Sequence, residues 1–210
     1  SVRKSSSVSR SVVATLVCLI VISPWPIRNR VVFGQWAFLR TNFGFEFWMS
    51  NYHGSQGRDW AGRHPTSNPQ ELATYVKEGE LAYVQGKYKI ARQFVRDYPL
   101  EFLTLTAKRI PMFWDGSTIK YNYPAAPYWM PWSFPMLSLL LIPSLVLACV
   151  RHVRGWPLFL GALALYPAPY YIVHSQARFR HAIEPMMLLL IAYAGVKLYE
   201  RLWKARDLSI

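Results

Sequence analysis

Long apolar runs alternate with polar segments along this sequence, and they set the first expectation about its structure. A helix that crosses a bilayer needs roughly 20 predominantly apolar residues. Four runs approach that length, and they cover residues 11–27, 132–150, 156–173 and 182–199. The first and fourth are the shortest or most interrupted. The pattern predicts an all-α polytopic membrane protein with about four transmembrane helices.

Basic residues gather at alternate ends of these runs, which predicts an orientation. Short cytoplasmic segments of membrane proteins carry an excess of Lys and Arg. The basic flanks are Arg3, Lys4 and Arg10, then Arg151 and Arg154, then Arg201, Lys204 and Arg206. Both termini are therefore expected in the cytoplasm. The chain then divides into a cytoplasmic flank with the first span (1–27), an extracytoplasmic region of loops and amphipathic helices (28–131), three further spans (132–199) and a cytoplasmic tail (200–210).

The extracytoplasmic region contains helix signals of its own. Asn68 as N-cap, Pro69 at the first helical position and Glu71 three residues after the cap predict a helix that runs to about residue 85. A second helix is expected from about residue 87. Its apolar face would hold Ile90, Ala91, Phe94 and Val95.

The rest of this region is rich in aromatic residues and in residues that favour turns. Pro99 is expected to kink or restart the second helix. The amphipathic piece that follows, residues 100–114, is expected to lie along the outer membrane surface. Residues 121–135 place prolines between aromatics and predict an ordered interfacial loop. In residues 24–51 the apolar run gives way to a polar, aromatic segment, so a membrane exit is expected in this stretch. Tight turns are expected at Gly34, Asn42, Gly44 and Asn51.

Composition and charge favour a membrane protein over a nucleic-acid-binding one. The 210 residues are 52% hydrophobic and carry a net charge of +13. No nucleic acid partner is expected, because the apolar residues come in long runs and no basic stretch lies on a soluble fold. The charge is better matched to cytoplasmic flanks, membrane lipids and a phosphate-bearing substrate. Cys18 and Cys149 both fall inside predicted spans, so a structural disulfide is not expected.

A short loop before the fourth run carries the sharpest chemical signal. It contains Arg178, Arg180, His181 and Glu184, on the side of the membrane where short loops usually lack positive charge. A guanidinium is a planar fork that fits phosphate oxygens. These residues are therefore candidates for binding a substrate phosphate. The simpler alternative is that they bind ordinary anionic lipid or pair with Glu184.

Two further groups are candidates for substrate contacts. Arg28 and Asn29 lie just outside the first run, where they would either complete a phosphate pocket or anchor the chain at the interface. A possible sugar or acceptor surface comprises Arg40, Asn42, Glu46, Trp48 and Asn51. Aromatic faces and planar polar groups recognise glycans, and packing of a compact loop is the alternative. Residues 53–64, with Asp59 and Arg63, would either cover a substrate or simply be exposed.

Several common catalytic signatures are missing from the sequence. It has no Gly-rich phosphate loop, nucleophile elbow, HExxH motif or paired cysteines. A nucleotide-sugar enzyme, a familiar hydrolase and a metalloprotease therefore have no support. His174 and His181 lack a matching acid cluster, so no metal or other cofactor is expected. No residue is assigned as a catalytic base.

Several motifs resemble those of one enzyme family, in the same order along the chain. They are PW-x-x-RN from Pro24, GELAY from Gly79, A-x-x-F-V-x-x-YP-x-x-F from Ala91, R-x-x-x-FW from Arg109 and ARFRHAIEP from Ala177. Together they resemble the polyprenyl-phosphate-dependent membrane glycosyltransferases of the GT-C fold, which are family 39-like and include the dolichyl-phosphate-mannose-protein mannosyltransferases. The resemblance is to their C-terminal half.

The resemblance implies an enzyme that transfers a sugar from a polyprenyl-phosphate-linked donor to a glycan, lipid or protein acceptor outside the cytoplasm. In that family an acidic residue near the start of the full-length chain acts as general base. This chain begins at Ser1, and we expect it to be a fragment that supplies the phosphate-binding half. The expected location is the bacterial inner membrane, with the active face extracytoplasmic. The alternatives are a polyprenyl-linked glycan ligase or polymerase, and a non-catalytic lipid-binding or assembly subunit of the membrane.

Overall fold

Helices make up all the regular structure in the part of the chain that the computed structural model describes. That part comprises residues 2–34, 36, 41–58, 61–119, 124–125 and 127–207. In chain order the elements are α1 (Val2–Ile22), α2 (Pro24–Phe33), α3 (Phe43–Ser50), the 3-10 helix η1 (Ala61–Arg63), α4 (Pro69–Glu78), α5 (Glu80–Asp97), α6 (Pro99–Asp115), α8 (Met130–Val150), α9 (Trp156–Leu165), α10 (Ala168–Ile172), the 3-10 helix η2 (Ala177–Ala182) and α11 (Glu184–Asp207). The expected all-α fold class is confirmed for these residues.

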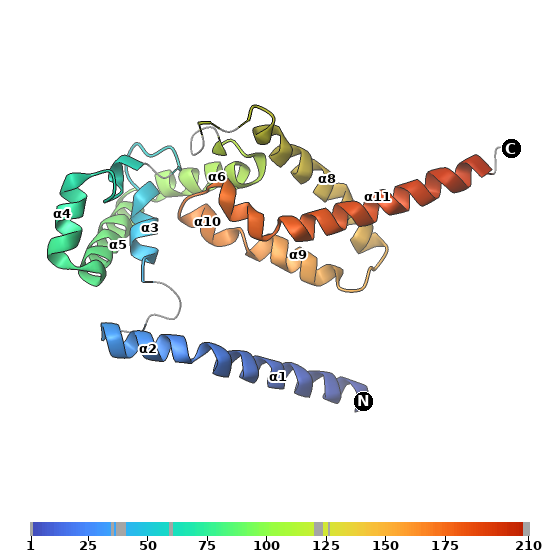
Figure 1. The fold of residues 1–210 in the computed structure, drawn as a ribbon, viewed down its shortest axis with the longest axis horizontal. Helices are drawn as coiled ribbons and strands as arrows, with labels where there is room; N and C mark the ends of the chain where they lie inside the picture. The colour runs from blue at the N-terminus through green and yellow to red at the C-terminus, as the bar shows by residue number, and fades with distance from the viewer. Residues whose placement is uncertain are drawn as a thin grey trace.

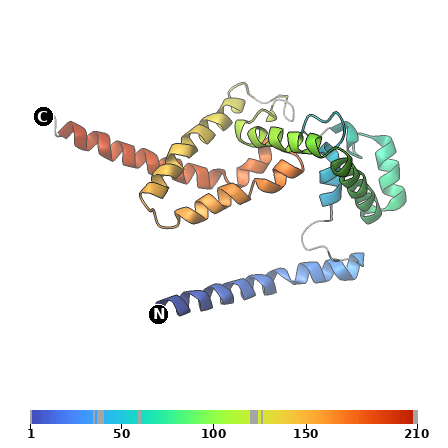
Figure 2. The same ribbon diagram turned by 180° about the vertical axis from the view of Figure 1, so that it is seen from behind.

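The helices form three groups (Figures 1 and 2). The first is a rod made of α1 and α2. The second, which we call the outer group, consists of α3, α4 and α5 at one end of the molecule. The third consists of α8 to α11 at the other end, and α6 lies between the second and third groups, in contact with α5, α8 and α10. Both chain termini lie toward the same end in the two views.

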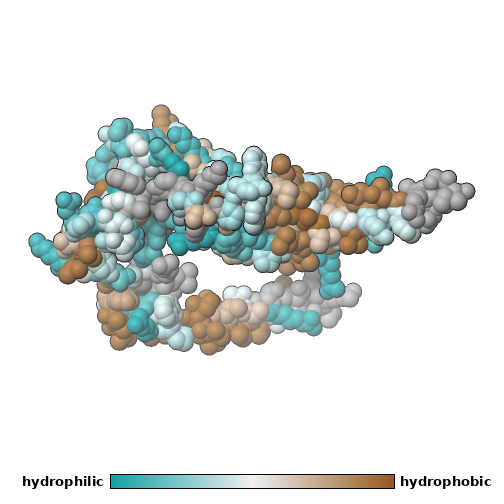
Figure 3. Space-filling view, turned by 45° about the horizontal axis from the view of Figure 1, so that its top comes forward, coloured by the Kyte–Doolittle hydropathy of each residue, from teal (hydrophilic) through white to brown (hydrophobic). Residues whose placement is uncertain are grey.

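Apolar side chains cover the helices that the sequence assigns to the membrane. Figure 3 shows hydrophobic surface over the half of the molecule that holds α8 to α11 and along part of the α1–α2 rod, and mostly hydrophilic surface over the outer group. Two stretches are long and apolar enough to cross a bilayer, Val8–Phe33 and Met130–Val150. This supports membrane association, with two candidate spans where the sequence predicted four.

The third apolar run is not a single helix, and the helix that holds the fourth run is not apolar throughout. The third is divided at Tyr166 and Pro167 into α9 and the short α10, because proline has no N–H with which to continue the helical hydrogen bonds. The fourth begins after η2, at Glu184, and its later half is charged. The charged residues there are Lys197, Glu200, Arg201, Lys204, Arg206 and Asp207.

The first span is longer than the apolar pattern indicated. The helical rod does not end near residue 27, where the first run was expected to end, because α2 continues it as far as Phe33, and Gly34 forms the predicted turn with φ 68°. Pro24 and Pro26 lie in the first turn of α2, where a missing N–H leaves no helical hydrogen bond unmade. At the bend between the two helices, Ser23 Oγ donates a 2.8 Å hydrogen bond to the carbonyl oxygen of Ile20.

The cap residues correctly located the start of α4 but not its end. Asn68 Oδ1 accepts hydrogen bonds from the N–H groups of Gln70 (3.0 Å) and Glu71 (3.2 Å), so the predicted N-cap is confirmed. The helix ends directly before Gly79, whose backbone adopts φ 77° and ψ 161°, and α5 begins directly after it. The prediction of one helix to about residue 85 is therefore wrong. A positive φ is a conformation that glycine adopts without the steric cost of a Cβ atom.

The helices α3 and α5 cross at close range, and their buried faces pack together. Aromatic residues of α3, including Phe45 and Trp48, pack with Tyr83 of α5 in one hydrophobic cluster. Gly44 lies inside α3 and does not form the predicted turn. A Cβ atom added there would lie 2.6 Å from the carbonyl oxygen of Val84 and 2.7 Å from Tyr88 Cβ. The two helices can approach this closely because the residue is glycine.

The helix α6 begins at Pro99, as predicted, but it packs in the middle of the molecule. Leu105, Arg109 and Phe113 follow one another at four-residue spacing, which places them on one helix face. All three are at most 2% exposed. This face joins the outer group to α8 and α10, so α6 positions the two halves of the molecule relative to each other.

Candidate functional site

A cavity in the outer group brings together carboxylates and aromatic rings. It has a volume of about 360 Å³, and its lining includes Asn42, Phe45, Glu46, Tyr75, Glu80 and Tyr83. We call it the carboxylate cavity. Small-molecule sites typically have volumes of about 300–1,000 Å³. The size of the carboxylate cavity therefore suits a small ligand such as a sugar.

Glu46 and Glu80 are both held in place at the cavity wall. Asn42 Nδ2 donates a 2.8 Å hydrogen bond to Glu46 Oε1, and His174 Nδ1 lies 3.7 Å from Glu46 Oε2. Glu80 Oε1 accepts a 2.5 Å hydrogen bond from Thr41 Oγ1. A carboxylate has about four lone-pair positions. Both side chains therefore keep acceptor capacity for the hydroxyl or amino groups of a ligand.

Aromatic rings form another wall of the same cavity. The Phe45 ring lies 5.3 Å from the His64 ring and 6.0 Å from the Tyr83 ring, and Tyr75 meets Tyr83 edge to face at 5.3 Å between centroids. The Tyr83 hydroxyl donates to Glu71 Oε2 at 2.8 Å. Burial, together with Glu71, raises the pKa of Tyr83, so its hydroxyl remains a donor at neutral pH. The rings thus form an apolar wall beside fixed polar groups, a combination typical of ligand sites.

A second, smaller cavity adjoins the carboxylate cavity. It has a volume of about 200 Å³, includes Arg28 and Asn29 of α2 in its lining, and shares Asn42 and Glu80 with the first cavity. Arg28 Nη1 donates to Asn29 Oδ1 at 3.2 Å, and the guanidinium carbon lies 5.8 Å from the centroid of the Trp25 ring. Asn29 is buried and Arg28 is exposed. An arginine has five N–H donors, so Arg28 retains donors for an anionic ligand.

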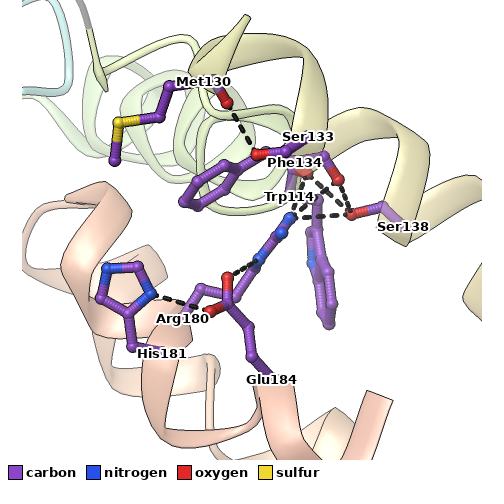
Figure 4. Close-up of polar contacts among 8 residues, drawn as sticks. All are labelled: Trp114, Met130, Ser133, Phe134, Ser138, Arg180, His181 and Glu184. Carbon is purple, nitrogen blue, oxygen red and sulfur yellow. Dashed lines mark hydrogen bonds and ion pairs between the residues drawn. The ribbon is translucent and has the colours of Figure 1, made fainter. Parts of the chain in front are cut away.

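Arg180 is fully buried where α6, α8 and α11 meet (Figure 4). Its Nη1 donates to the carbonyl oxygens of Trp114 and Phe134, each at 2.9 Å, and to Ser138 Oγ at 3.1 Å. Its Nε donates to Glu184 Oε1 at 3.1 Å. Burial lowers the pKa of Arg180, and the bond to Glu184 opposes this effect. Arg180 therefore fastens η2 to its neighbours through Nε and Nη1, while its Nη2 is buried without a hydrogen-bond partner in the part of the chain that the structure describes.

The other residues of this loop differ from Arg180 in exposure. His181 Nδ1 lies 2.9 Å from Glu184 Oε2, so Glu184 contacts two loop residues at once (Figure 4). The His181 side chain is 53% exposed. Arg178 is exposed, with its guanidinium carbon 5.4 Å from the centroid of the Phe179 ring. Of the two loop arginines, Arg178 is the one that a phosphate can reach.

His174 connects this loop with the carboxylate cavity. It is 3% exposed, and its ring centroid lies 5.5 Å from that of Phe179, which stacks on Tyr170 at 4.4 Å. The same imidazole faces Glu46 of α3. The chain around Arg178 therefore borders the outer group, although these residues are far apart in the sequence.

A second buried arginine, Arg109, supports the same region from α6. Its side chain is 0% exposed, and its guanidinium donates to six oxygen atoms at distances of 2.9–3.3 Å. The acceptors are the carbonyl oxygens of Ser50, Gly57, Tyr171 and Ile172, together with Ser50 Oγ and Asn51 Oδ1. Burial lowers the pKa of Arg109 to about 10, so the group is cationic at neutral pH. It fastens the end of α3 and the end of α10 to α6.

The expected sugar or acceptor surface is partly a packing core. Two of its members line the carboxylate cavity, but Trp48 and Asn51 are 5% and 1% exposed. Trp48 lies between the Arg63 guanidinium, at 3.8 Å from the ring centroid, and Lys87 Nζ, at 4.1 Å. The packing alternative therefore holds for these two residues. Arg40 lies outside the described residues.

The segment that would cover a substrate is anchored where it is described. His53 Nδ1 lies 2.9 Å from Glu101 Oε2, and the Gly54 N–H donates to Glu101 Oε1 at 3.1 Å. The hydrogen bond from Gly54, and then that from His53, lower the pKa of Glu101. The carboxylate is thus ionised at neutral pH and holds residues 53 and 54 on α6. Asp59 lies outside the described residues.

An apolar groove lies between α6, α8 and α9, beside Arg180. It has a volume of about 620 Å³, and its lining includes Pro111, Trp114, Leu141, Ile142, Leu145 and Leu163. Its polar edge is formed by Asp115 and Ser138. A groove of this lining suits the hydrocarbon chain of a lipid.

The sequence alone did not assign roles to Arg109, Glu80 and His174. A signal for Arg109 was present, because it lies on the apolar stripe of α6, where a cation is buried and must find acceptors. No local signal marks Glu80, since its position in the site depends on how α3 and α5 pack. No local signal marks His174 either, because its contact with Glu46 joins distant parts of the chain.

Comparisons with known proteins assign no family. No family profile, curated protein or solved structure matches this chain. Within the described ranges, no group of three or more His, Cys, Asp or Glu side chains is placed to hold a metal ion. The function is therefore argued from the chemistry of the site.

Proposed function

We propose that this chain binds the substrates of an integral membrane glycosyltransferase, which transfers a sugar from a polyprenyl-phosphate donor to an extracytoplasmic glycan, lipid or protein. The observation that carries the proposal is the adjoining pair of cavities that share Asn42 and Glu80. One offers carboxylates and aromatic rings, which suit a sugar. The other offers the exposed Arg28, which suits a phosphate.

In this proposal the residues have separate roles. Glu46 and Glu80 accept hydrogen bonds from sugar hydroxyl groups in the carboxylate cavity. Arg28 and Arg178 contact the donor phosphate, because both are exposed. Arg180 is a positioning residue that holds the loop, and Glu184 fixes Arg180 and His181 through the two hydrogen bonds described above. Asn29 orients the Arg28 guanidinium.

The reaction needs a base and a stabilised leaving group. The acceptor oxygen forms a bond to the anomeric carbon, the bond from that carbon to the phosphate oxygen breaks, and the acceptor proton passes to the base. Arginine N–H groups aimed at the phosphate stabilise the negative charge that it gains. The residues of this chain supply this second component, and we assign none of them as the base.

The proposal includes a membrane arrangement with four crossings. The α1–α2 rod and α8 form two of them, while the combined α9–α10 segment and α11 form the others. The outer group then lies outside the bacterial inner membrane, and both termini lie in the cytoplasm. Support comes from the positions of the termini at one end of the molecule (Figures 1 and 2) and from the basic flanks of the apolar runs.

A non-catalytic lipid-binding subunit is the second candidate, and the apolar groove favours it. A groove that holds only a hydrocarbon chain does not distinguish a lipid with a sugar from one without. The two candidates therefore differ in whether the sugar contributes to binding.

The test is equilibrium binding of a panel of short-chain polyprenyl-phosphate hexoses to the purified protein in nanodiscs. At least one hexose-bearing lipid is expected to bind more tightly than the same polyprenyl phosphate without sugar. Glu46→Gln removes the charge from the carboxylate that faces the cavity. It should lower the affinity for that lipid about tenfold, which corresponds to the loss of one hydrogen bond to a charged group.

Glu78→Gln is the matched control, because Glu78 is exposed at the end of α4 and the substitution removes the same charge away from the cavity. It should leave binding unchanged. Equal effects of the two substitutions would count against the sugar site. Equal affinity for all lipids, with or without sugar, would replace the transferase proposal with the lipid-binding one.

A further inference from the structure

A third cavity lies between the end of α8 and the later half of α11. It is far along α11 from the loop that contains Arg178, Arg180 and His181, which we call the basic loop. It has a volume of about 510 Å³. Its polar lining residues are Arg151, Tyr193, Lys197, Glu200, Arg201 and Lys204. Neither the proposed sugar site nor the proposed phosphate site uses any of them.

The positions of these cations follow from helix geometry. Lys197, Arg201 and Lys204 are spaced four and three residues apart, which places them on one face of α11. Arg151 directly follows the last residue of α8. The two helices pack together through Ala148, Met187 and other buried residues of one cluster. Four cations from two elements therefore surround one cavity.

The lining of this cavity carries more positive than negative charge. Glu200 is the single carboxylate in the lining, and Lys197 Nζ pairs with its Oε2 at 2.8 Å. Among the residues up to 204, whose side chains the structure describes in this part of α11, no carboxylate lies within 4.0 Å of Arg151, Arg201 or Lys204. An excess of positive charge around a shared space favours the binding of an anion.

The cavity also has an apolar side. Leu147 and Leu198 belong to its lining, and Leu198 is 59% exposed. Exposed apolar side chains continue along both helices, as at Val150 and Leu202. A ligand that fills this space therefore needs an anionic group joined to hydrocarbon. Basic pockets between transmembrane helices bind anionic lipid headgroups.

We propose that this cavity binds the phosphate headgroup of an anionic phospholipid, whose acyl chains lie along the exposed apolar faces of α8 and α11. The phosphate oxygens are held by Arg151 and Arg201, with Lys204 as an additional charge. The inference is independent of the proposed glycosyltransferase function, because it uses the opposite end of the helices and none of the same residues.

The test compares the melting temperature of the purified full chain in nanodiscs of phosphatidylcholine alone with that in nanodiscs containing phosphatidylglycerol. Phosphatidylglycerol is expected to raise the melting temperature by several degrees, and native mass spectrometry should detect it as a retained lipid. In the double variant Arg151→Gln/Arg201→Gln, the rise and the retained lipid should both be lost. The variant should still melt cooperatively in phosphatidylcholine alone.

Arg154→Gln is the matched control, because Arg154 is an exposed arginine in the same α8–α9 connection but does not line the cavity. It should keep the full response to phosphatidylglycerol. The proposal is overturned if Arg154→Gln loses as much of the response as the double variant, since the effect would then be general surface charge. It is also overturned if neither variant changes the response, or if inorganic phosphate alone raises the melting temperature as much as the lipid.

Discussion

Replacement of Arg109 by alanine is expected to lower the free energy of unfolding by about 3–5 kcal/mol. The substitution removes six hydrogen bonds at once and leaves buried oxygens of α3, α10 and residue 57 without their donor. It also leaves a cavity beside α6, where the arginine side chain was. Arg109→Lys should be nearly as destabilising, because an ammonium has no planar fork with which to reach acceptors on three segments.

The measurement is chemical unfolding of the purified protein in detergent, followed by tryptophan fluorescence. Lys108→Ala is the control, since Lys108 is exposed on the same helix, and it should stay within about 0.5 kcal/mol of the parent protein. If the Arg109→Lys variant were as stable as the parent protein, a positive charge at this position would be sufficient. The planar set of guanidinium hydrogen bonds would then not be what holds the three segments together.

The two arginines of the basic loop are expected to give opposite results when each is replaced by alanine. Arg180→Ala should lower the free energy of unfolding by about 3–5 kcal/mol, because it leaves the partly buried Glu184 without its guanidinium partner and removes the link between η2, α6 and α8. Arg178→Ala should leave stability within about 0.5 kcal/mol of the parent, since its side chain is exposed. Instead, it should weaken binding of polyprenyl phosphate about tenfold, as expected for the loss of one charge-assisted hydrogen bond.

Thermal melting and lipid binding of both variants separate these roles. Arg180→Lys adds a further comparison, because it keeps the charge and the ion pair with Glu184 but loses most of the hydrogen bonds to carbonyl oxygens. An Arg180→Ala protein that melts like the parent but no longer binds the lipid would show that Arg180 contacts the substrate directly, against the arrangement in Figure 4.

Local signals in the sequence predicted the features that depend on neighbouring residues. The Asn68 cap could be predicted because it involves only the next three residues, and the structure confirms it. The helix restart at Pro99 could be predicted because proline lacks the N–H that would continue the preceding helix. The break at Gly79 was missed, although glycine with a positive φ commonly ends a helix. The division of the third apolar run at Pro167 is not visible in the hydropathy, which stays apolar on both sides of the proline.

The environments of the two buried arginines could not be predicted from neighbouring residues. Arg109 finds its acceptors near residues 50, 57 and 171, and Arg180 finds two of its acceptors at Trp114 and Phe134. A charged residue in a loop is usually exposed, and this holds for Arg178 but not for Arg180. The carboxylate cavity likewise depends on the close packing of α3 and α5 at Gly44, which composition and spacing do not reveal.

The sugar of a lipid-linked donor is proposed to occupy the carboxylate cavity, and photo-crosslinking can locate it there. A polyprenyl-phosphate hexose with a diazirine on the sugar would be bound to the purified protein, irradiated, and the labelled peptides identified by mass spectrometry. Labels are expected within residues 42–46 and 72–84, and both an excess of unlabelled donor and the Glu46→Gln substitution should reduce them. Labels confined to the apolar groove of α6, α8 and α9, unaffected by Glu46→Gln, would contradict this position of the sugar.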